Sequence, residues 1–495
     1  MAGTQQEIDV AVIGAGLSGI NAGYRIQEAL PNYSYTIFES RHELGGTWSL
    51  FKYPGIRSDS DLYTFGFQFD PWREDKSIAP APMILDYLQG VANRHGIDKH
   101  IKYHHAVESL DWSSELQKWK ININVDGKEN KVFWARFVIM STGYYDYKKA
   151  LPAEIPGIEQ FKGEVVHPQF WPEDLAYADK KVVIVGSGAT AVTLLPAMHE
   201  TGAAHVTMLQ RSPGYFINLP TANTINNILR SVLPASWAHS LIRLRTLTLT
   251  YAFYYFCRAF PGSAKRLLRK ATERELPPNI PVDPHFTPKY NPWDQRMCVT
   301  PNGDFFAALR SGKASVATGH IEEVTAEGII LKSGEYIPAD VIVTATGLKV
   351  QMCGNATLSV DGERVIVGDK YLWRGSMLQD VPNLAFFLGY TNASWTLGSD
   401  ATARLFVRIV KQMERKGMTS TTPLMGDSET DNQKPPDMEA LNLNSTYIKK
   451  AVMDGQFPMN LDANPWRARR NYFSDSWFAS FGDVGKGLRF DRVSV

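Results

Sequence analysis

Two glycine-rich turns, each between an apolar strand pattern and a helix pattern, constrain the fold of this chain most strongly. The first is G-x-G-x-x-G over Gly14–Gly19, and the second is G-x-G-x-x-A over Gly186–Ala191. In such a turn the glycines allow a sharp bend, a close backbone approach to a pyrophosphate and tight packing of helix on strand. The N-terminus of the following helix presents its N–H groups to the phosphates. The pattern predicts an α/β chain with two dinucleotide-binding domains.

The two turns differ in the residue that ends the strand after each of them. Glu39 ends a predicted strand at 35–39 and Arg211 lies at the end of one at 205–212, each 25 positions after the first glycine of its turn. A carboxylate there binds a ribose diol and repels a 2′-phosphate, whereas a guanidinium pairs with that phosphate. We therefore expect two Rossmann-like domains, the first for FAD and the second for NADP. An ordinary surface charge is the alternative at both positions.

The segment Gly45-Gly46-Thr47-Trp48 follows the first acid. In flavoproteins a loop of this kind covers the pyrophosphate and reaches toward the isoalloxazine. Disulfide reductases carry a redox cysteine after a similar stretch, but here Trp48 stands in that place and no cysteine precedes Cys257. The sequence therefore argues against a disulfide reductase.

Bulk properties narrow the class of protein. With 495 residues, a net charge of +1 and three cysteines far apart in sequence, nothing indicates a nucleic-acid partner, a disulfide framework or a metal site. The sparse cysteines are typical of a reducing cytoplasm. A first strand near Ile8 leaves little room for a signal peptide, and no apolar run reaches the ~18 residues of a transmembrane segment. We expect a cytoplasmic enzyme.

Two similar strand-to-turn segments, 137–143 and 341–347, indicate where the chain crosses between domains. The predicted map is an FAD-binding domain over 1–145 and 347–495, an NADP-binding domain over 155–213 and 296–346, and a helical insertion over 214–295. Residues 419–440 are polar and predict a surface loop.

The helical insertion contains an apolar, aromatic stretch at 235–260. We expect it to form a cap over the substrate cleft. A weak peripheral contact with a membrane surface is the alternative, supported by the basic residues Lys265, Arg266, Arg269 and Lys270.

Between the two turns, Phe161–Pro172 fits F-x-G-x-x-x-H-x-x-x-W-P at every fixed position. In this setting the motif resembles the fingerprint of the type I Baeyer–Villiger monooxygenases, which belong to the class B flavoprotein monooxygenases. Three further segments, 52–61, 290–299 and 389–397, are similar to the ethionamide-activating subgroup of that family. The resemblance covers nearly the whole chain and implies oxidation of ketones and of sulfur in thioethers or thioamides, with small molecules and dioxygen as the partners.

The resemblance also implies roles for individual residues. Arg296 matches the catalytic arginine, Asp59 the acid that holds it, and Arg57 and Ser58 the residues beside the nicotinamide. Further FAD contacts would be Gly14, Gly16, Ser18, Gly19, Glu39, Gly46, Thr47, Trp48 and, through its backbone, Val107. Further NADP contacts would be Gly186, Ser187, Gly188, Ala189, Thr190, Gln210 and Arg211.

Three points stay open in this transfer. Gln295 replaces a lysine that many family members place before the catalytic arginine, so the preference for NADPH would either be weaker or rest more on Arg211 and Gln210. His167 is expected to link domain movement to NADP binding rather than to act in catalysis. Arg296 has an alternative role in an ordinary salt bridge with Asp294.

The implied mechanism passes through a peroxyflavin whose anion attacks the carbonyl carbon and rearranges to an ester or lactone. Arginine suits a site that faces this anion, because its charge persists at any working pH and its fork donates to two oxygens. Two alternatives keep both cofactors. A flavin-containing monooxygenase would act mainly on sulfur or nitrogen, and an NADPH oxidase would release hydrogen peroxide.

Overall fold

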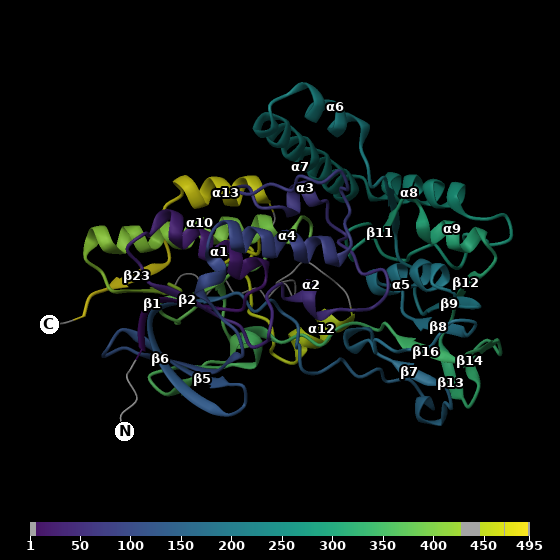
Figure 1. The fold of residues 1–495 in the computed structure, drawn as a ribbon, viewed down its shortest axis with the longest axis horizontal. Helices are drawn as coiled ribbons and strands as arrows, with labels where there is room; N and C mark the ends of the chain where they lie inside the picture. The colour runs from purple at the N-terminus through teal and green to yellow at the C-terminus, as the bar shows by residue number, and fades with distance from the viewer. Residues whose placement is uncertain (1–5, 427–445, 470, 494–495) are drawn as a thin grey trace. The chain divides into compact units, whose positions relative to one another are not determined.

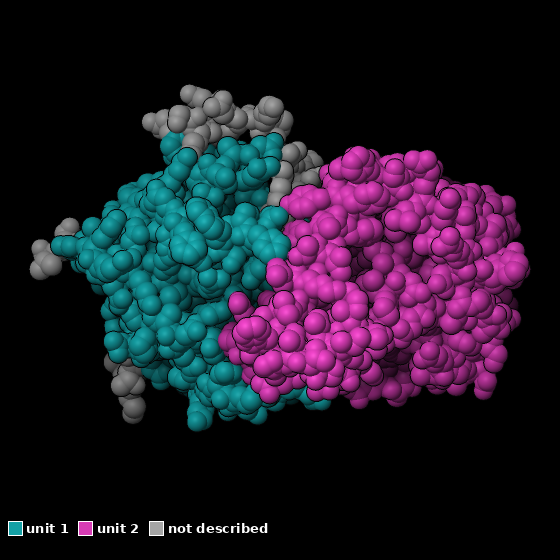
Figure 2. All heavy atoms as spheres, turned by 90° about the horizontal axis from the view of Figure 1, so that it is seen from above, with its two compact units in different colours: residues 1–49, 85–147, 350–495 teal, residues 50–84, 148–349 magenta. Residues whose placement is uncertain are grey.

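The computed structural model describes residues 6–426, 446–469 and 471–493, and this part of the chain forms two compact units. Unit 1 comprises residues 1–49, 85–147 and 350–495, and unit 2 comprises residues 50–84 and 148–349 (Figure 2). Each unit is built around a parallel sheet that carries one of the two glycine turns.

The sheet of unit 1 has a parallel core in the order β3-β2-β1-β6-β21. These strands are β1 (Gln6–Ile13), β2 (Tyr35–Phe38), β3 (Ile101–Lys102), β6 (Glu129–Met140) and β21 (Leu384–Phe386). Figure 1 labels β1, β2 and β6 of this core. The strands β4 (His105–Ser113) and β5 (Lys118–Val125) extend the sheet as an antiparallel meander from β6. Beyond β4 the sheet continues into β17 (Thr357–Val360) and β18 (Glu363–Arg364), and β19 (Leu372–Trp373) and β20 (Met377–Leu378) lie beside β21.

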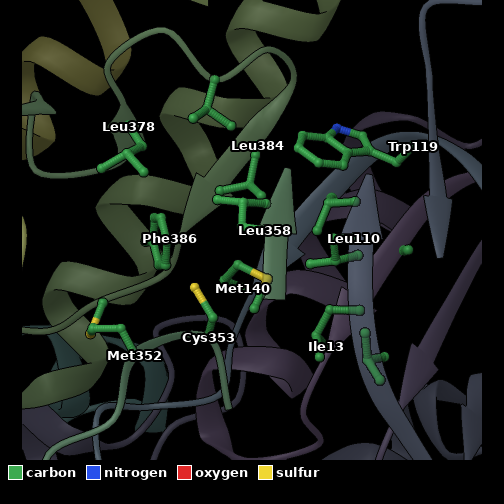
Figure 3. Close-up of a cluster of buried hydrophobic side chains, with 14 of the residues drawn as sticks. Ile13, Leu110, Trp119, Met140, Met352, Cys353, Leu358, Leu378, Leu384 and Phe386 are labelled. Carbon is green, nitrogen blue, oxygen red and sulfur yellow. The ribbon is translucent and has the colours of Figure 1, made fainter. Parts of the chain in front are cut away.

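Helix α1 (Leu17–Ala29) directly follows the first glycine turn and packs beside the long helix α10 (Trp395–Lys416). The other helices of this unit are α2 (Thr47–Leu50), α4 (Ala81–Arg94), α12 (Thr446–Met453) and α13 (Tyr472–Phe481). Helices α2 and α4 cross the boundary, because Leu50 and residues 81–84 belong to unit 2. The side of the sheet shown in Figure 3 is closed by a buried cluster that includes Ile13, Leu110, Trp119, Met140 and Phe386. The thiol of Cys353 points into this cluster (Figure 3), and burial raises its pKa to about 12, so this cysteine is an inert core residue.

Unit 2 contains a five-stranded parallel sheet in the order β12-β9-β8-β16-β7. Its strands are β7 (Glu164–Val166), β8 (Lys181–Val185), β9 (His205–Gln210), β12 (Ala314–Thr318) and β16 (Val341–Thr344). Helix α5 (Ala189–Glu200) follows the second glycine turn and packs with α9 (Asp304–Arg310). Two smaller sheets complete the unit: β10 (Phe216–Leu219) with β11 (Cys298–Pro301), and β13 (Ile321–Thr325), β14 (Gly328–Leu331) and β15 (Tyr336–Pro338). The predicted α/β class with two Rossmann-like domains is confirmed.

The helical insertion of unit 2 forms α6 (Thr224–Val232), α7 (Ala235–Ala259) and α8 (Pro261–Glu275). In Figure 1 α6 and α7 project away from the five-stranded sheet of their unit. Among the described residues, no helix is both long and apolar enough to cross a bilayer.

Residues 50–84, which the sequence assigns to the FAD-binding domain, make their contacts in unit 2. The hydroxyl of Ser77 donates to the carbonyl of Thr221 (3.1 Å), and the buried guanidinium of Arg243 donates to the carbonyls of Tyr63 (3.0 Å) and Gly66 (2.8 Å). This segment, which includes α3 (Leu62–Phe65), is therefore fastened to the helical insertion by polar contacts. The assignment of nucleotides to units and the finer domain boundaries stay predictions.

The prediction of a surface loop over 419–440 is wrong for the first part of that range. Ser420–Pro423 form a buried strand, β22, which pairs with β23 (Leu488–Asp491) near the end of the chain. Pairing with a distant strand outweighs the polar local composition. Residues 427–440 lie outside the described residues.

Candidate functional site

The first glycine turn of unit 1 leaves no room for side chains at two positions. Gly14 has φ +100°, and a Cβ atom there would lie 2.8 Å from the carbonyl oxygen of Ser141. A Cβ atom on Gly19 would lie 2.0 Å from the carbonyl oxygen of Gly14. No side chain caps the N-terminus of α1. The turn therefore offers bare backbone and a helix N-terminus, as a pyrophosphate requires.

The carboxylate of Glu39 lies over this turn and is 7% exposed. It accepts hydrogen bonds from the N–H of Ala15 (2.8 Å) and from the N–H of Arg41 (2.9 Å). These bonds hold the acid at the end of β2, where a ribose diol would reach it.

The Gly-Gly-Thr-Trp segment lies against the same turn. A Cβ atom on Gly46 would lie 3.2 Å from Cα of Gly16, so the two glycines let the loop and the turn approach closely. The hydroxyl of Thr47 lies 3.2 Å from the hydroxyl of Tyr147, and Trp48 is half-buried on α2. Unit 1 thus brings both predicted FAD motifs together.

Two further predicted FAD contacts, Ser18 and Val107, lie on different elements of unit 1. Ser18 is 5% exposed and accepts a hydrogen bond from the indole N–H of Trp395 (3.2 Å), whose ring stacks on Tyr144. Val107 lies on β4 at an irregularity in its pairing with β5. Trp395 itself packs against the buried cluster of unit 1.

The second glycine turn, in unit 2, has a contrasting pair of glycines. Gly186 has φ +144°, and a Cβ atom there would lie 2.3 Å from the carbonyl oxygen of Ala345. A Cβ atom on Gly188 would meet no atom within 4 Å. Gly188 therefore faces open space at the N-terminus of α5, which no side chain caps. Ser187, Ala189 and Thr190 lie half-buried around it.

Gln210 ends β9 and Arg211 follows it, and the two side chains lie in different environments. The amide nitrogen of Gln210 donates to the carbonyl of His285 (2.7 Å) and to the hydroxyl of Thr318 (3.0 Å), and the residue is 1% exposed. Arg211 is exposed. Of the two, Arg211 is the better placed to meet a charged ligand.

The loop that carries Asp59 packs on α5. Gly55 has φ +76°, and a Cβ atom there would lie 2.6 Å from Cβ of Ala197. Tyr53 shares a hydrogen bond with the side chain of Thr190, and burial and the charge of Asp59 raise the pKa of the Tyr53 hydroxyl. The second nucleotide turn and the predicted catalytic loop are therefore one packed assembly within unit 2.

In this unit the guanidinium of Arg296 lies close enough to Asp59 for its charge to affect the pKa of that carboxyl. Burial raises the pKa of the Asp59 carboxyl, and the positive charges of Arg296 and Arg57 oppose that rise. Burial raises the pKa of the neighbouring Cys298 thiol to about 12, and Arg296 partly offsets this as well. Asp294, the alternative partner for Arg296, accepts from Arg258 at 2.7 Å. The structure brings the predicted arginine and acid together and leaves Arg296 exposed.

Arg57 and Ser58 hold the loop in shape. Nη1 of Arg57 lies 2.5 Å from Oδ2 of Asp304, at the start of α9. The hydroxyl of Ser58 donates to the carbonyl of Ser60 (2.8 Å) and accepts from its N–H (3.0 Å), and Ser58 is 2% exposed. Ser58 can therefore contact a nicotinamide only through limited surface.

His167 follows edge strand β7 directly. Its Nδ1 accepts a hydrogen bond from the N–H of Gln169 (3.2 Å), and burial lowers the pKa of its imidazole. The ring is therefore neutral near pH 7 and shapes the turn that leads to Trp171, which packs against the core of unit 2.

Sequence reasoning missed Tyr53 and Asp304, which position Thr190 and Arg57. Tyr53 begins the Y-P-G-x-x-x-D segment, so its place in a motif was a usable signal. Asp304 lies 247 positions from its partner and belongs to no motif, so nothing in the sequence marked it.

Unit 1 with an acid at its turn, and unit 2 with an arginine, define a flavoprotein oxidoreductase with two dinucleotide-binding domains. The family of flavin-binding monooxygenase-like proteins matches residues 7–237. The chain is 43% identical over 488 residues to the FAD-containing monooxygenase EthA of Mycolicibacterium smegmatis, covering 99% of this chain and 96% of that protein. It is 41% identical over 488 residues to EthA of Mycobacterium tuberculosis, covering 98% of each.

Solved structures share the fold at low sequence identity. A steroid monooxygenase bound to NADP has a TM-score of 0.78 at 18% identity, covering 98% of this chain and 100% of that one. Cyclohexanone monooxygenase in its closed form has a TM-score of 0.73 at 19% identity, covering 99% and 100%.

This chain belongs to the flavin-binding monooxygenase-like family. The predicted family, the monooxygenase class and a flavin cofactor are therefore confirmed. The roles of individual site residues stay predictions.

Proposed function

We propose that this chain is an FAD- and NADPH-dependent Baeyer–Villiger monooxygenase. It inserts one oxygen atom from dioxygen beside a ketone carbonyl, and the product is an ester or lactone. The same site oxidises sulfur in thioethers or thioamides. The observation that carries the proposal is the electrostatic interaction of Arg296 with the buried carboxyl of Asp59, whose loop packs against α5 of the second nucleotide site.

The proposed cofactor sites follow the two turns. Gly14, Gly16, Glu39 and Gly46 of unit 1 hold FAD, which supplies the activation of dioxygen when NADPH has reduced it. Gly186 and Gly188 of unit 2 let the backbone approach NADP, and Arg211 pairs with its 2′-phosphate. Residues 50–84 join the NADP-binding unit in this proposal, since Gly55 seats their loop on α5. A cytoplasmic location belongs to the same proposal.

Arg296 supplies the charge that the ketone reaction requires. Negative charge forms on oxygen as the carbonyl is attacked, and a fixed cation stabilises it best where water is scarce. Arginine keeps its proton at any working pH, so it donates hydrogen bonds without titrating. The carboxyl of Asp59 orients the guanidinium, and the positive charge of Arg296 in turn lowers the pKa of that carboxyl against the larger effect of burial, which raises it.

Two relationships support a ketone substrate. The fold matches cyclohexanone monooxygenase and a steroid monooxygenase, and Phe161–Pro172 carries the complete fingerprint with Trp171 packed in unit 2. The second candidate is a flavin-containing monooxygenase acting mainly on sulfur or nitrogen. The match of residues 7–237 to the broader family favours that candidate. An NADPH oxidase that releases hydrogen peroxide is the third.

The test reduces the holoenzyme with NADPH without oxygen, admits labelled dioxygen, and analyses products from cyclohexanone and from methyl phenyl sulfide. Arg296→Ala is expected to retain FAD and to lower ester formation by at least ~10²-fold. Arg258→Ala, an exposed arginine of the same unit, is the control and should match the parent. Ester formation by Arg296→Ala at the parent rate would contradict the role of Arg296. Complete recovery of NADPH electrons as hydrogen peroxide would contradict the monooxygenase activity itself.

A further inference from the structure

The helical insertion of unit 2 exposes two apolar helix faces. On α6 the exposed face comprises Ile225, Ile228 and Val232, which are 50%, 54% and 69% exposed. On α7 it comprises Trp237 (68%), Leu241 (44%), Leu244 (53%) and Tyr255 (48%). At 3.6 residues per turn these four side chains of α7 fall within about 60° of one another. We call the seven residues the apolar face.

The apolar face does not result from loose packing of α7. Elsewhere on its surface α7 is buried through Ala238, Ile242, Leu247, Tyr251 and Cys257. The helix is therefore anchored in unit 2 by one side and presents large apolar groups on another. Exposed apolar residues scattered singly are ordinary, but a row that ends in Trp and Tyr is typical of an interaction site.

The helices that carry the apolar face, and α8 after them, are rich in basic residues. From Thr201 to Thr272 the sequence contains no aspartate or glutamate, while α6, α7 and α8 carry eight basic residues over that span. Arg230 pairs with Asp75 outside the insertion, whereas Arg258 and Arg269 pair with Asp294 and Asp283 near the end of the insertion. No ion pair is recorded among the described residues for three cations of α8: Lys265, Arg266 and Lys270.

We propose that the apolar face docks on the surface of a bilayer that contains anionic phospholipid. Trp237 and Tyr255 suit the interface, where an apolar ring meets a polar headgroup layer. The unpaired cations of α8 complement anionic headgroups, each adding about 1 kcal/mol near such a surface. A second copy of this chain is a poorer occupant, because it would bring like charges together. Since none of the described helices can cross a bilayer, the attachment is interfacial.

The proposal is tested by flotation of the FAD-loaded, full-length protein with vesicles of phosphatidylcholine alone or mixed with phosphatidylglycerol. Binding is expected only to the anionic vesicles and should fall as salt is raised. Trp237→Ser should weaken binding about tenfold, the equivalent of about 1.4 kcal/mol. Arg266→Glu with Lys270→Glu should weaken it at least as much. Leu241→Gln is a second apolar variant in case Trp237→Ser folds poorly, as judged by FAD content and Tm.

Trp477→Ser provides the matched control, because Trp477 on α13 is 62% exposed and belongs to unit 1. It should bind vesicles like the parent. An equal loss of vesicle binding in Trp477→Ser and Trp237→Ser would indicate nonspecific adsorption through exposed apolar residues and would overturn the proposal. Absence of vesicle binding by the parent would overturn it too. Sedimentation of the parent as a dimer that Trp237→Ser dissociates, without any vesicle binding, would assign the face to a second copy of the chain.

Discussion

The guanidinium of Arg57 and the carboxylate of Asp304 form a 2.5 Å ion pair, which joins the predicted catalytic loop to the first turn of α9. The two side chains are 13% and 20% exposed. Burial raises the pKa of the Asp304 carboxyl, and Arg57 opposes that rise. An ion pair so shielded from water costs more to break than a surface pair, because one charge is left without its partner.

Asp304→Asn is therefore expected to lower Tm and to raise KM for NADPH about tenfold, a loss of about 1.4 kcal/mol, while FAD content stays unchanged. Thermal melts and initial rates check this. Asp283→Asn is the control, because Asp283 pairs with Arg269 at a site where its side chain is 60% exposed. If Asp304→Asn behaves like Asp283→Asn, the ion pair does not position Arg57.

Gly186→Ala and Gly188→Ala should separate folding from nucleotide binding. The first substitution places Cβ 2.3 Å from a backbone carbonyl at φ +144°, so Tm should fall by several degrees. The second meets no protein atom, so Tm should stay the same while KM for NADPH rises at least about tenfold, because the methyl group occupies space for the pyrophosphate. A Gly188→Ala variant with the parent KM would show that no pyrophosphate approaches this glycine.

Arg211→Ala should change the choice of coenzyme. Loss of hydrogen bonds to a charged phosphate typically costs about 1.5–3 kcal/mol, so KM for NADPH should rise about tenfold or more. KM for NADH, which lacks that phosphate, should barely change. Gln295→Lys is the converse variant and should lower KM for NADPH. Equal effects of Arg211→Ala on both coenzymes would contradict a contact with the 2′-phosphate.

Asp61 should make stability depend on pH. Its carboxylate caps α3 by accepting from the N–H of Tyr63 (2.9 Å), but burial raises its pKa to about 7. The folded state then holds a proton that the unfolded state, with a pKa of about 3.9, releases, so stability falls as pH rises from about 4 to about 7. The pKa difference of about three corresponds to at most about 4 kcal/mol.

The isosteric variant Asp61→Asn lacks this titration and keeps the cap. The difference in Tm between the variant and the parent should therefore grow in favour of the variant as pH rises through that range. A constant difference in Tm from pH 4 to pH 8 would contradict the raised pKa of Asp61.

Features that depend on local pattern were predictable from the sequence. Both glycine turns, the acid at Glu39 and the helix at Thr224–Val232 are determined by residues within one or two dozen positions. The helix pattern and the exact spacing of glycines express backbone geometry, which a short segment sets for itself.

Features that depend on long-range packing were not predictable. The attachment of residues 50–84 to unit 2 rests on Gly55 fitting against Ala197, and Arg57 finds Asp304 across 247 positions. The buried strand at Ser420–Pro423 was hidden in the same way, because its partner β23 lies near the end of the chain. No hydrophobic periodicity in either segment predicts which part of the chain it packs against.

Residues 50–84 have a practical consequence for recombination between relatives. A fragment spanning only 148–349 would carry Arg296 and Asp304 but leave Asp59, Gly55 and Arg57 behind. After grafting into a homologous scaffold, Arg296 and Asp304 would each face a partner residue that comes from the other parent. Chimeras of these enzymes should therefore exchange two separate gene segments at once, and crossover points chosen from the glycine turns alone will tend to yield inactive hybrids.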